Sequence, residues 1–120
     1  MSDPAELDRI ELNPEDAKLV TLARAARARN SADEGAAVRD DTGRTYVATT
    51  VALPSVQLSA LRAAVVIAAA SGAAGLEAAA VVRSSGLIDG DDRAVVADLA
   101  AGAPIFVAGV DGVVRSAVVS

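Results

Sequence analysis

The sequence predicts an α/β domain in which helices and strands alternate in the order α-β-β-α-β-α-β-β. Helix-like and strand-like stretches are interleaved along the chain, which favours layers rather than separate halves. Of the residues, 52% are hydrophobic, and only Tyr46 and Phe106 are aromatic. A core of Ala, Val, Leu and Ile suits close packing of helices on a sheet. At 120 residues, the chain fits one domain; we expect a flexible arm at residues 1–12 and the domain at 13–120.

The first helix is predicted to begin after Asn13. Asn13-Pro14-Glu15-Asp16 combines a side-chain cap, proline at the first helical position and carboxylates in the first turn. Inward-facing residues follow, namely Leu19, Val20, Leu22, Ala23 and Ala26. Arg24, Arg27 and Arg29 lie in the last turns, where they complement the negative helix end or form an anion-binding patch. We prefer the first interpretation.

Two strands are predicted at residues 35–39 and 44–51, joined by Asp40-Asp41-Thr42-Gly43. We interpret the two aspartates as turn formers rather than as metal ligands. Pro54-Ser55 then opens a helix expected at residues 56–70, which ends at Ser71-Gly72. This helix is apolar on nearly every side and must be covered on more than one face. A neighbouring subunit is the expected cover.

The second half of the chain predicts a central strand, a helix and a hairpin. Residues 76–83 are almost uniformly apolar, as in a strand buried on both faces. A helix begins at Asp91 or Asp92, turns Val95, Val96 and Leu99 inward and ends at Gly102. Strands at residues 104–110 and 113–119 follow, and Asp111-Gly112 between them predicts a two-residue hairpin turn.

The composition excludes several classes of function. The chain contains no cysteine and no histidine, so it has no Ser/His/Asp relay, no Cys/His pair and no zinc site of the usual nitrogen and sulfur kind. A net charge of −5 argues against general nucleic-acid binding. No stretch is long enough to span a membrane and the start does not resemble a secretory signal, so we expect a cytoplasmic protein. The bias toward Arg and Ala suggests a bacterial genome.

Three stretches in this order resemble the cytidine deaminase family of zinc-dependent nucleoside deaminases, over about residues 17–120. Residues 35–38 and 41–46 (GAAV, DTGRTY) are similar to the "VGAAL…DG..Y" hairpin of the family. Residues 59–64 (SALRAA) take the place of "CAERTA", and residues 88–99 (IDGDDRAVVADL) align without a gap on "PCGACRQVISEL". The resemblance implies a three-layer α-β-α sandwich around a five-stranded mixed sheet.

The resemblance also implies where a deaminase site would lie. The zinc thiolate positions fall on Ser59, Asp89 and Asp92, and the position of the proton-shuttling glutamate falls on Leu61. Arg62 corresponds to the arginine that follows this glutamate in the family motif. Deamination needs a metal-activated water and a carboxylate that moves its proton. We therefore expect no catalytic, cofactor-binding or metal-binding residue here, only degenerate former-site positions at Ser59, Leu61, Arg62, Asp89 and Asp92.

The substrate-binding positions of the family are also replaced. The aromatic residue that stacks on the pyrimidine corresponds to Ala32, and Glu34 stands where the family has valine. The pair that holds the ribose falls near Thr50 and Ala52. Without stacking and ribose hydrogen bonds, we expect neither turnover nor tight binding of cytidine.

The acidic stretch at Asp89, Asp91 and Asp92 permits another interpretation. Carboxylates suit Mg²⁺, Mn²⁺ or Ca²⁺, whereas the same residues at a helix start cap the helix and complement its dipole. We prefer the second. Ser59 as a lone nucleophile has no evident base to activate it.

Two classes of function remain. The first is an inactive deaminase-like protein that forms a dimer or tetramer through helix 56–70 and has a possible protein partner. The second is a small-molecule enzyme or metabolite sensor that reuses the former pocket through Ser59, Arg62, Asp89 and Asp92. A core filled by Leu61 would favour the first; an open cavity lined by Arg62, Asp89 and Asp92 would favour the second.

Overall fold

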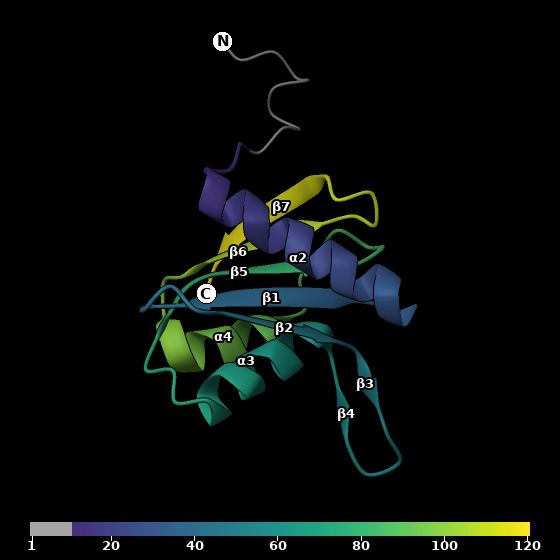
Figure 1. The fold of residues 1–120 in the computed structure, drawn as a ribbon, viewed down its shortest axis with the longest axis horizontal. Helices are drawn as coiled ribbons and strands as arrows, with labels where there is room; N and C mark the ends of the chain where they lie inside the picture. Colours follow the sequence, from purple (N-terminus) through teal and green to yellow (C-terminus); the bar gives the residue numbers. More distant parts are fainter. Residues whose placement is uncertain (1–10) are drawn as a thin grey trace.

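A five-stranded mixed sheet forms the middle layer of the protein, in a computed structural model that describes residues 11–120. The strand order is β2-β1-β5-β6-β7 (Figure 1). β5 and β6 run parallel, and the other neighbouring strands are antiparallel. The strands are β1 (Gly35–Asp40), β2 (Thr45–Thr49), β5 (Leu76–Val82), β6 (Pro104–Ala108) and β7 (Val114–Val119). The prediction of a mixed sheet with residues 76–83 at its centre is confirmed.

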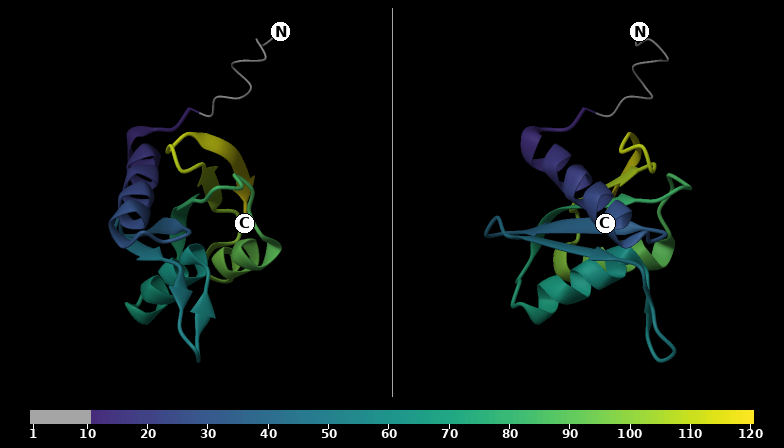
Figure 2. Two further views of the ribbon diagram at one scale, coloured as in Figure 1. Left: turned by 90° about the vertical axis from the view of Figure 1, so that its right-hand side faces the viewer. Right: turned by 45° about the vertical axis from the view of Figure 1, so that its right-hand side comes forward.

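Helices cover both faces of this sheet. α2 (Pro14–Asn30) lies on one face, and α3 (Ala60–Ala70) and α4 (Gly90–Ala100) lie on the other (Figures 1 and 2). Because side chains alternate along a strand, β1 turns Ala37 toward α2 and turns Ala36 and Val38 into the core beneath α3 and α4. The three-layer α-β-α arrangement is confirmed, as is the predicted order of the three helices and the five strands of this sheet.

The start of α2 is confirmed at the predicted residue. The Asn13 Oδ1 atom accepts a hydrogen bond of 2.8 Å from the backbone N–H of Asp16. At the other end, Arg27 Nε donates to the carbonyl of Asp33, and Arg24 lies against Gly112. Arg27 therefore contacts the turn that follows the helix, and Arg24 contacts the loop between β6 and β7.

Both hairpins of the main sheet close through a left-handed glycine. In the first, Asp40 Oδ1 accepts from the N–H and hydroxyl of Thr42 and from the N–H of Arg44, so its predicted role as a turn former is confirmed. In the second, the Gly109 N–H donates to the Val113 carbonyl and Gly112 has φ +82°. The predicted two-residue turn is wrong: residues 110–112 form a longer loop with glycine at the left-handed position.

The helix predicted at residues 56–70 is shorter than expected. It begins at Ala60, and residues 51–58 form a two-stranded arm instead, with β3 (Val51–Ala52) paired to β4 (Gln57–Leu58). Ser59 is extended, and its hydroxyl accepts from the Arg62 N–H as an N-cap. Pro54 and the β-branched Val56 favour the extended backbone. The β3–β4 arm projects from the body on the side opposite α2 (Figures 1 and 2).

Two remaining expectations concern the ends of elements and the N-terminus. α4 begins at Gly90, one residue before the predicted range, and Gly102 follows its end with φ +93°. The arm predicted at residues 1–12 falls almost wholly outside the described residues. Among residues 11–120, the structure has no helix that combines the length and the apolar character of a membrane span.

Candidate functional site

The N-terminal ends of α3 and α4 meet beneath the sheet. Ser59 is the N-cap of α3, and Asp92 lies in the first turn of α4. The Ser59 hydroxyl donates a 2.7 Å hydrogen bond to Asp92 Oδ1, which joins the two helices across 33 positions of sequence. Both helix ends present positive dipoles, so a carboxylate at this point is favourable.

Arg62 completes a closed polar cluster with these two residues, which we call the Ser59 cluster. Its Nε atom lies 3.3 Å from Asp92 Oδ1 and 3.2 Å from Ser59 Oγ. The Asp92 side chain is 2% exposed, whereas that of Arg62 is 37% exposed. The cluster is therefore an ion pair with its negative partner buried and its positive partner reaching the surface.

One acceptor of the Ser59 cluster has no partner within the described chain. Asp92 Oδ2 is buried and makes no hydrogen bond to residues 11–120. Buried carboxylate oxygens are usually satisfied, and the second oxygen here relies on the dipole of α4 and the charge of Arg62. The cluster thus depends strongly on Arg62.

A second ion-pair chain lies beside the first and was not predicted. Glu34 Oε1 accepts from the Ala60 N–H at the start of α3, and Glu34 Oε2 lies 3.1 Å from Arg83 Nε. Arg83 Nη1 in turn lies 3.4 Å from Asp89 Oδ2. The available signal was the position of Arg83, a charged residue directly after a buried strand, at the edge where α/β domains place their sites.

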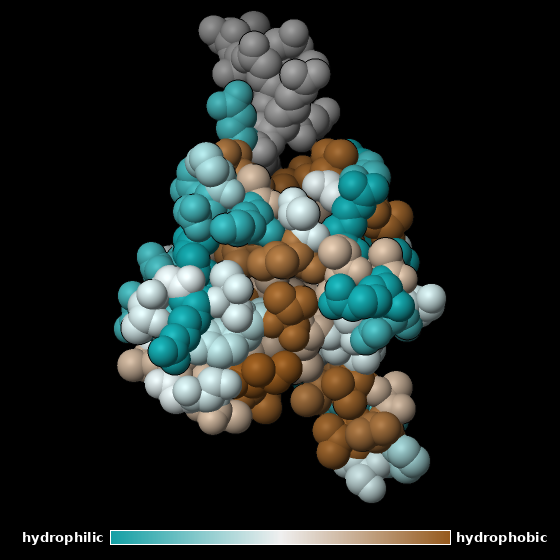
Figure 3. Space-filling model, in the orientation of Figure 1, coloured by the Kyte–Doolittle hydropathy of each residue, from teal (hydrophilic) through white to brown (hydrophobic). Residues whose placement is uncertain are grey.

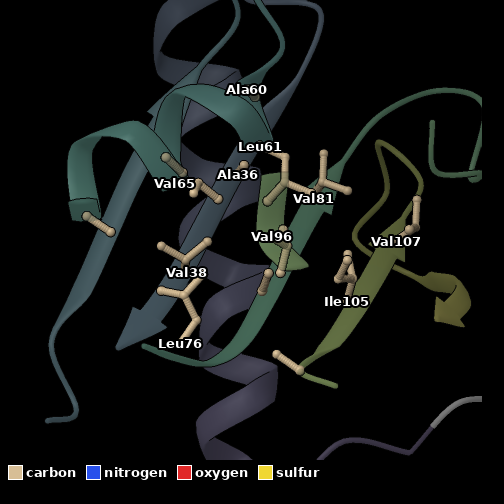
Figure 4. Close-up of a cluster of buried hydrophobic side chains, with 14 residues drawn as sticks. Ala36, Val38, Ala60, Leu61, Val65, Leu76, Val81, Val96, Ile105 and Val107 are labelled. Atoms are coloured by element: carbon tan, nitrogen blue, oxygen red, sulfur yellow. The ribbon is translucent and has the colours of Figure 1, made fainter. Parts of the chain in front are cut away.

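Leu61 occupies the interior rather than the polar site. It is fully buried, and its side chain points into the cluster of hydrophobic residues that includes Val81 and Val96 (Figure 4). Complete burial of a leucine contributes about 1.5–3 kcal/mol. The position that the resemblance assigns to a proton shuttle is therefore part of the core.

The hollows beside Arg62 and Arg83 do not bring Arg62, Asp89 and Asp92 together. A shallow hollow of about 250 Å³ lies between the β3–β4 arm and Arg62. Another of about 430 Å³ is lined by Arg27, Asp33, Glu34, Thr50, Arg83 and Ser84. Asp92 contributes to neither of these hollows.

The other predicted binding positions do not assemble into a pocket. Thr50 Oγ1 accepts from the Glu34 N–H at 3.0 Å, which uses its hydroxyl within the chain. Ala52 lies exposed on the β3–β4 arm, and Ala32 lies in the turn after α2. Thr50 and Glu34 are thus adjacent, whereas Ala52 lies on a separate projection.

The residues present do not fit a metal ion. The carboxylates of Asp89 and Asp92 are directed to different arginines, Arg83 and Arg62, and Asp91 is exposed. Within residues 11–120, no three carboxylates converge as a metal site would require. Zinc fits least well, because the sequence lacks thiolate and imidazole ligands and a guanidinium lies within the cluster.

Ser59 is likewise held in a structural role. Its oxygen accepts from the backbone N–H and from Nε of Arg62 while its proton goes to Asp92. An activated nucleophile needs a base that is free to take the proton, whereas the Asp92 carboxylate is engaged by the guanidinium of Arg62. The arrangement caps a helix.

Comparisons with known proteins agree with this architecture. A family model described as cytidine deaminase-like matches residues 12–112. The cytidine deaminase of Burkholderia pseudomallei superposes with a TM-score of 0.74 at 23% identity, over 85% of this chain and 90% of that one. The corresponding values are 0.66, 23%, 81% and 89% for the enzyme of Mycobacterium leprae, and 0.62, 26%, 75% and 80% for that of Mycobacterium tuberculosis. No curated protein matches the sequence.

Proposed function

This chain belongs to the cytidine deaminase-like family, and we propose that it is a catalytically inactive member. Ser59 and Asp92 stand where the resemblance places zinc thiolates, and Leu61 stands where it places the glutamate that moves the proton. Its function is then assembly: an oligomeric scaffold, or a module that binds another macromolecule, in the bacterial cytoplasm. The similar solved structures are named as cytidine deaminases, so the proposal separates this chain from them in activity while keeping their fold.

The burial of Leu61 is the observation that carries the proposal. A leucine cannot move a proton, and loss of general acid/base catalysis alone lowers a rate by about 10²–10⁴-fold. Replacement by a carboxylate would place a charge in a packed core, beside Val81 and Val96, at a large desolvation cost. The site is therefore several substitutions away from a working one.

The surface of α3 supports the assembly part of the proposal. Val66 is 50% exposed and Ile67 is 41% exposed on its outward face, with Ala69 and Ala70 beside them. Exposed aliphatic residues that gather on one helix face are typical of an interface. A dimer or tetramer through this helix, which the sequence predicted over residues 56–70, remains the proposed state, with a protein partner as a further possibility.

Two measurements test the inactivity. Purified protein is incubated with cytidine and Zn²⁺, and uridine is quantified by chromatography, with the Burkholderia pseudomallei enzyme as positive control. We expect no uridine above the enzyme-free rate. Native mass spectra with and without Zn²⁺, Mg²⁺ and cytidine should show an oligomer without adducts. A stoichiometric metal or nucleoside adduct would instead support the alternative, a small-molecule enzyme or sensor with an acidic site at Asp89–Asp92.

A further inference from the structure

We propose that residues 1–10 lie along β7 of their own copy and cover the part of the sheet that α2 leaves open. Leu7 and Ile10 would pack on Ala117 and Val119. The segment that the sequence predicts as a flexible arm is then ordered on the body of the protein. This inference depends neither on the proposed inactivity nor on the proposed assembly, because it concerns the face of the sheet opposite α3.

The first observation is that α2 covers only part of its face of the sheet. The helix packs on β1, β2 and β5. The β5 side chains beneath it, Ala78, Ala80 and Val82, are buried. β7 lies beyond β6, at the edge of the sheet (Figure 1). The cover that α2 provides therefore ends before the last strand.

The side chains of β7 on this face are accordingly exposed. Ala117 is the register partner of Phe106, and Val119 is that of Pro104. Register partners share a face, and Phe106 belongs to the cluster beneath α2, so both β7 side chains lie on the α2 side. Ala117 is exposed and Val119 is 54% exposed. Hydrophobic residues also reach the surface around the β6–β7 hairpin (Figure 3), and an edge strand of this kind is prone to associate unless it is covered.

The second observation is the place where residues 1–10 join the body. Leu12 packs against the cluster that holds Phe106 and Val114, and the start of α2 lies near β7 in each view (Figures 1 and 2). The six residues of β7 span about 20 Å. Ten residues reach about 33 Å when extended and about 15 Å as a helix. The segment is therefore long enough to cover most or all of the strand.

The third observation is the sequence pattern of the segment. Asp3-Pro4-Ala5-Glu6 has the residue order of a helix start, with a capping aspartate, proline at the first helical position and glutamate three residues after the cap. In such a turn Leu7 and Ile10 share one face, and Asp8 and Arg9 lie on the other. The pattern supplies two adjacent aliphatic side chains for an exposed apolar surface.

The fourth observation is the charge beside β7. Residues 1–10 contain three carboxylates and one arginine. Arg93 is exposed and donates to the backbone carbonyl of Val119, and it forms no ion pair with any of residues 11–120. Asp8 is placed to pair with it when Ile10 lies on β7. Because the segment is tethered at this face, its effective concentration is on the order of millimolar, which favours it over a separate chain.

Disulfide trapping tests the geometry, because the chain has no native cysteine. Leu7→Cys is combined with Ala117→Cys, or with Lys18→Cys as the control, and each protein is oxidised at low concentration. Lys18 is exposed on α2 and is close in sequence, so a freely moving segment would reach it as well. We expect an intramolecular disulfide, detected by the mass of the monomer, mainly with Ala117→Cys. Equal yields in the two proteins would overturn the proposal, and disulfide-linked dimers would assign the face to a second copy instead.

Proteolysis tests the energetics in the full chain, because trypsin cleaves after Arg9. A docked segment is cut only when it opens. Ala117→Glu places a charge under Leu7 and Ile10 and should raise the rate of this cleavage about tenfold, as expected when an aliphatic contact is lost. Leu87→Glu, at a residue that is 68% exposed in the loop before α4, should leave the rate unchanged; circular dichroism checks that each variant keeps its fold.

Two outcomes of the proteolysis would contradict the proposal. The first is a parent protein that is cut after Arg9 as fast as a free peptide of residues 1–14. The second is an unchanged cleavage rate in the Ala117→Glu variant, which would place the segment on another surface.

Discussion

At the residue scale, the decisive feature is the ion pair between the buried carboxylate of Asp92 and the partly exposed guanidinium of Arg62. The side chain of Asp92 is 2% exposed, whereas that of Arg62 is 37% exposed. Removal of one partner of a buried pair is costly when the remaining charge stays buried. Removal of Arg62 should therefore cost more stability than removal of the charge of Asp92, although both changes break the same contact.

This inequality predicts the effect of two substitutions. Arg62→Ala leaves Asp92 buried with Ser59 as its hydrogen-bond donor and should lower the free energy of unfolding by about 2–3 kcal/mol, less than for a fully buried pair because solvent reaches Arg62. Asp92→Asn leaves an arginine that can turn to water and should cost about 1 kcal/mol. Urea unfolding measures both, with Lys18→Ala at an exposed cation as control. A larger cost for Asp92→Asn would contradict the argument.

Asp40 provides a prediction about pH. Hydrogen bonds from the Thr42 side chain, from Tyr46 and from the N–H groups of Arg44 and Thr42 lower the pKa of Asp40 from 3.8 to about 2. The unfolded chain binds this proton first as pH falls, so the stabilisation is complete above about pH 4 and is lost as pH approaches 2.

Thermal unfolding between pH 5 and pH 2 measures this loss. The Asp40→Asn variant should start less stable, because its amide accepts fewer of the hydrogen bonds, and should lose less stability on acidification than the parent chain. Asp91→Asn, at an exposed carboxylate, serves as the matched control. Equal acid sensitivity of the Asp40→Asn variant and the parent would show that Asp40 does not carry the effect.

At the scale of elements, α2 approaches β1 closely at Gly35. A Cβ atom at this glycine would collide with the carbonyl oxygen of Ala23 and the Cβ of Arg27. One obstacle is a backbone atom of the helix and the other is a Cβ bonded directly to that backbone, so neither can move as the end of a flexible side chain would. The contact between the α2 layer and the sheet therefore requires glycine at this position.

A single added methyl group tests this requirement. Gly35→Ala should lower the free energy of unfolding by about 2–3 kcal/mol through overpacking and displacement of α2. Gly90→Ala is the matched control, because a Cβ there meets no atom within 4 Å and the backbone φ is not positive. Denaturant titration of both variants distinguishes them. Similar stabilities would mean that α2 shifts without cost.

At the scale of the whole molecule, an acidic chain contains one long stretch that is almost without charge. The net charge is −5, while residues 45–76 contribute only Arg62. Assembly through that stretch opposes general repulsion with apolar burial. Salt changes the first term strongly, since the Debye length falls from about 10 Å at 0.1 M to about 3 Å at 1 M, and it leaves the second largely in place.

The proposed assembly should therefore tighten as salt rises. Sedimentation equilibrium in 0.05 M and 0.5 M NaCl should give a smaller dissociation constant at the higher salt concentration. The Ile67→Glu variant, which places a charge on the outward face of α3, should remain largely monomeric in both. Dissociation by salt would indicate that ion pairs, rather than the apolar face of α3, hold the copies together.

Much of the fold follows from local patterns in the sequence. The Asn13-Pro14 start of α2, the turn at Asp40 and the almost uniformly apolar β5 each specify backbone conformation through neighbouring residues, and the structure confirms them. The β3–β4 arm was missed because an apolar run of this length suits either a helix or an extended segment. In the structure, the N-cap at Ser59 marks the point where the extended segment ends and the helix begins.

The sequence alone also determined the chemistry that is missing, because folding cannot supply cysteine or histidine to a chain that lacks them. The tertiary structure decided which distant side chains meet. Ser59 and Asp92 are 33 positions apart, and Glu34 and Ala60 are 26 apart. Such pairs depend on strand order and on how two helix ends meet, which no local pattern encodes. Distance in the chain is the physical reason that the lack of cysteine and histidine could be read from the sequence and the ion pairs could not.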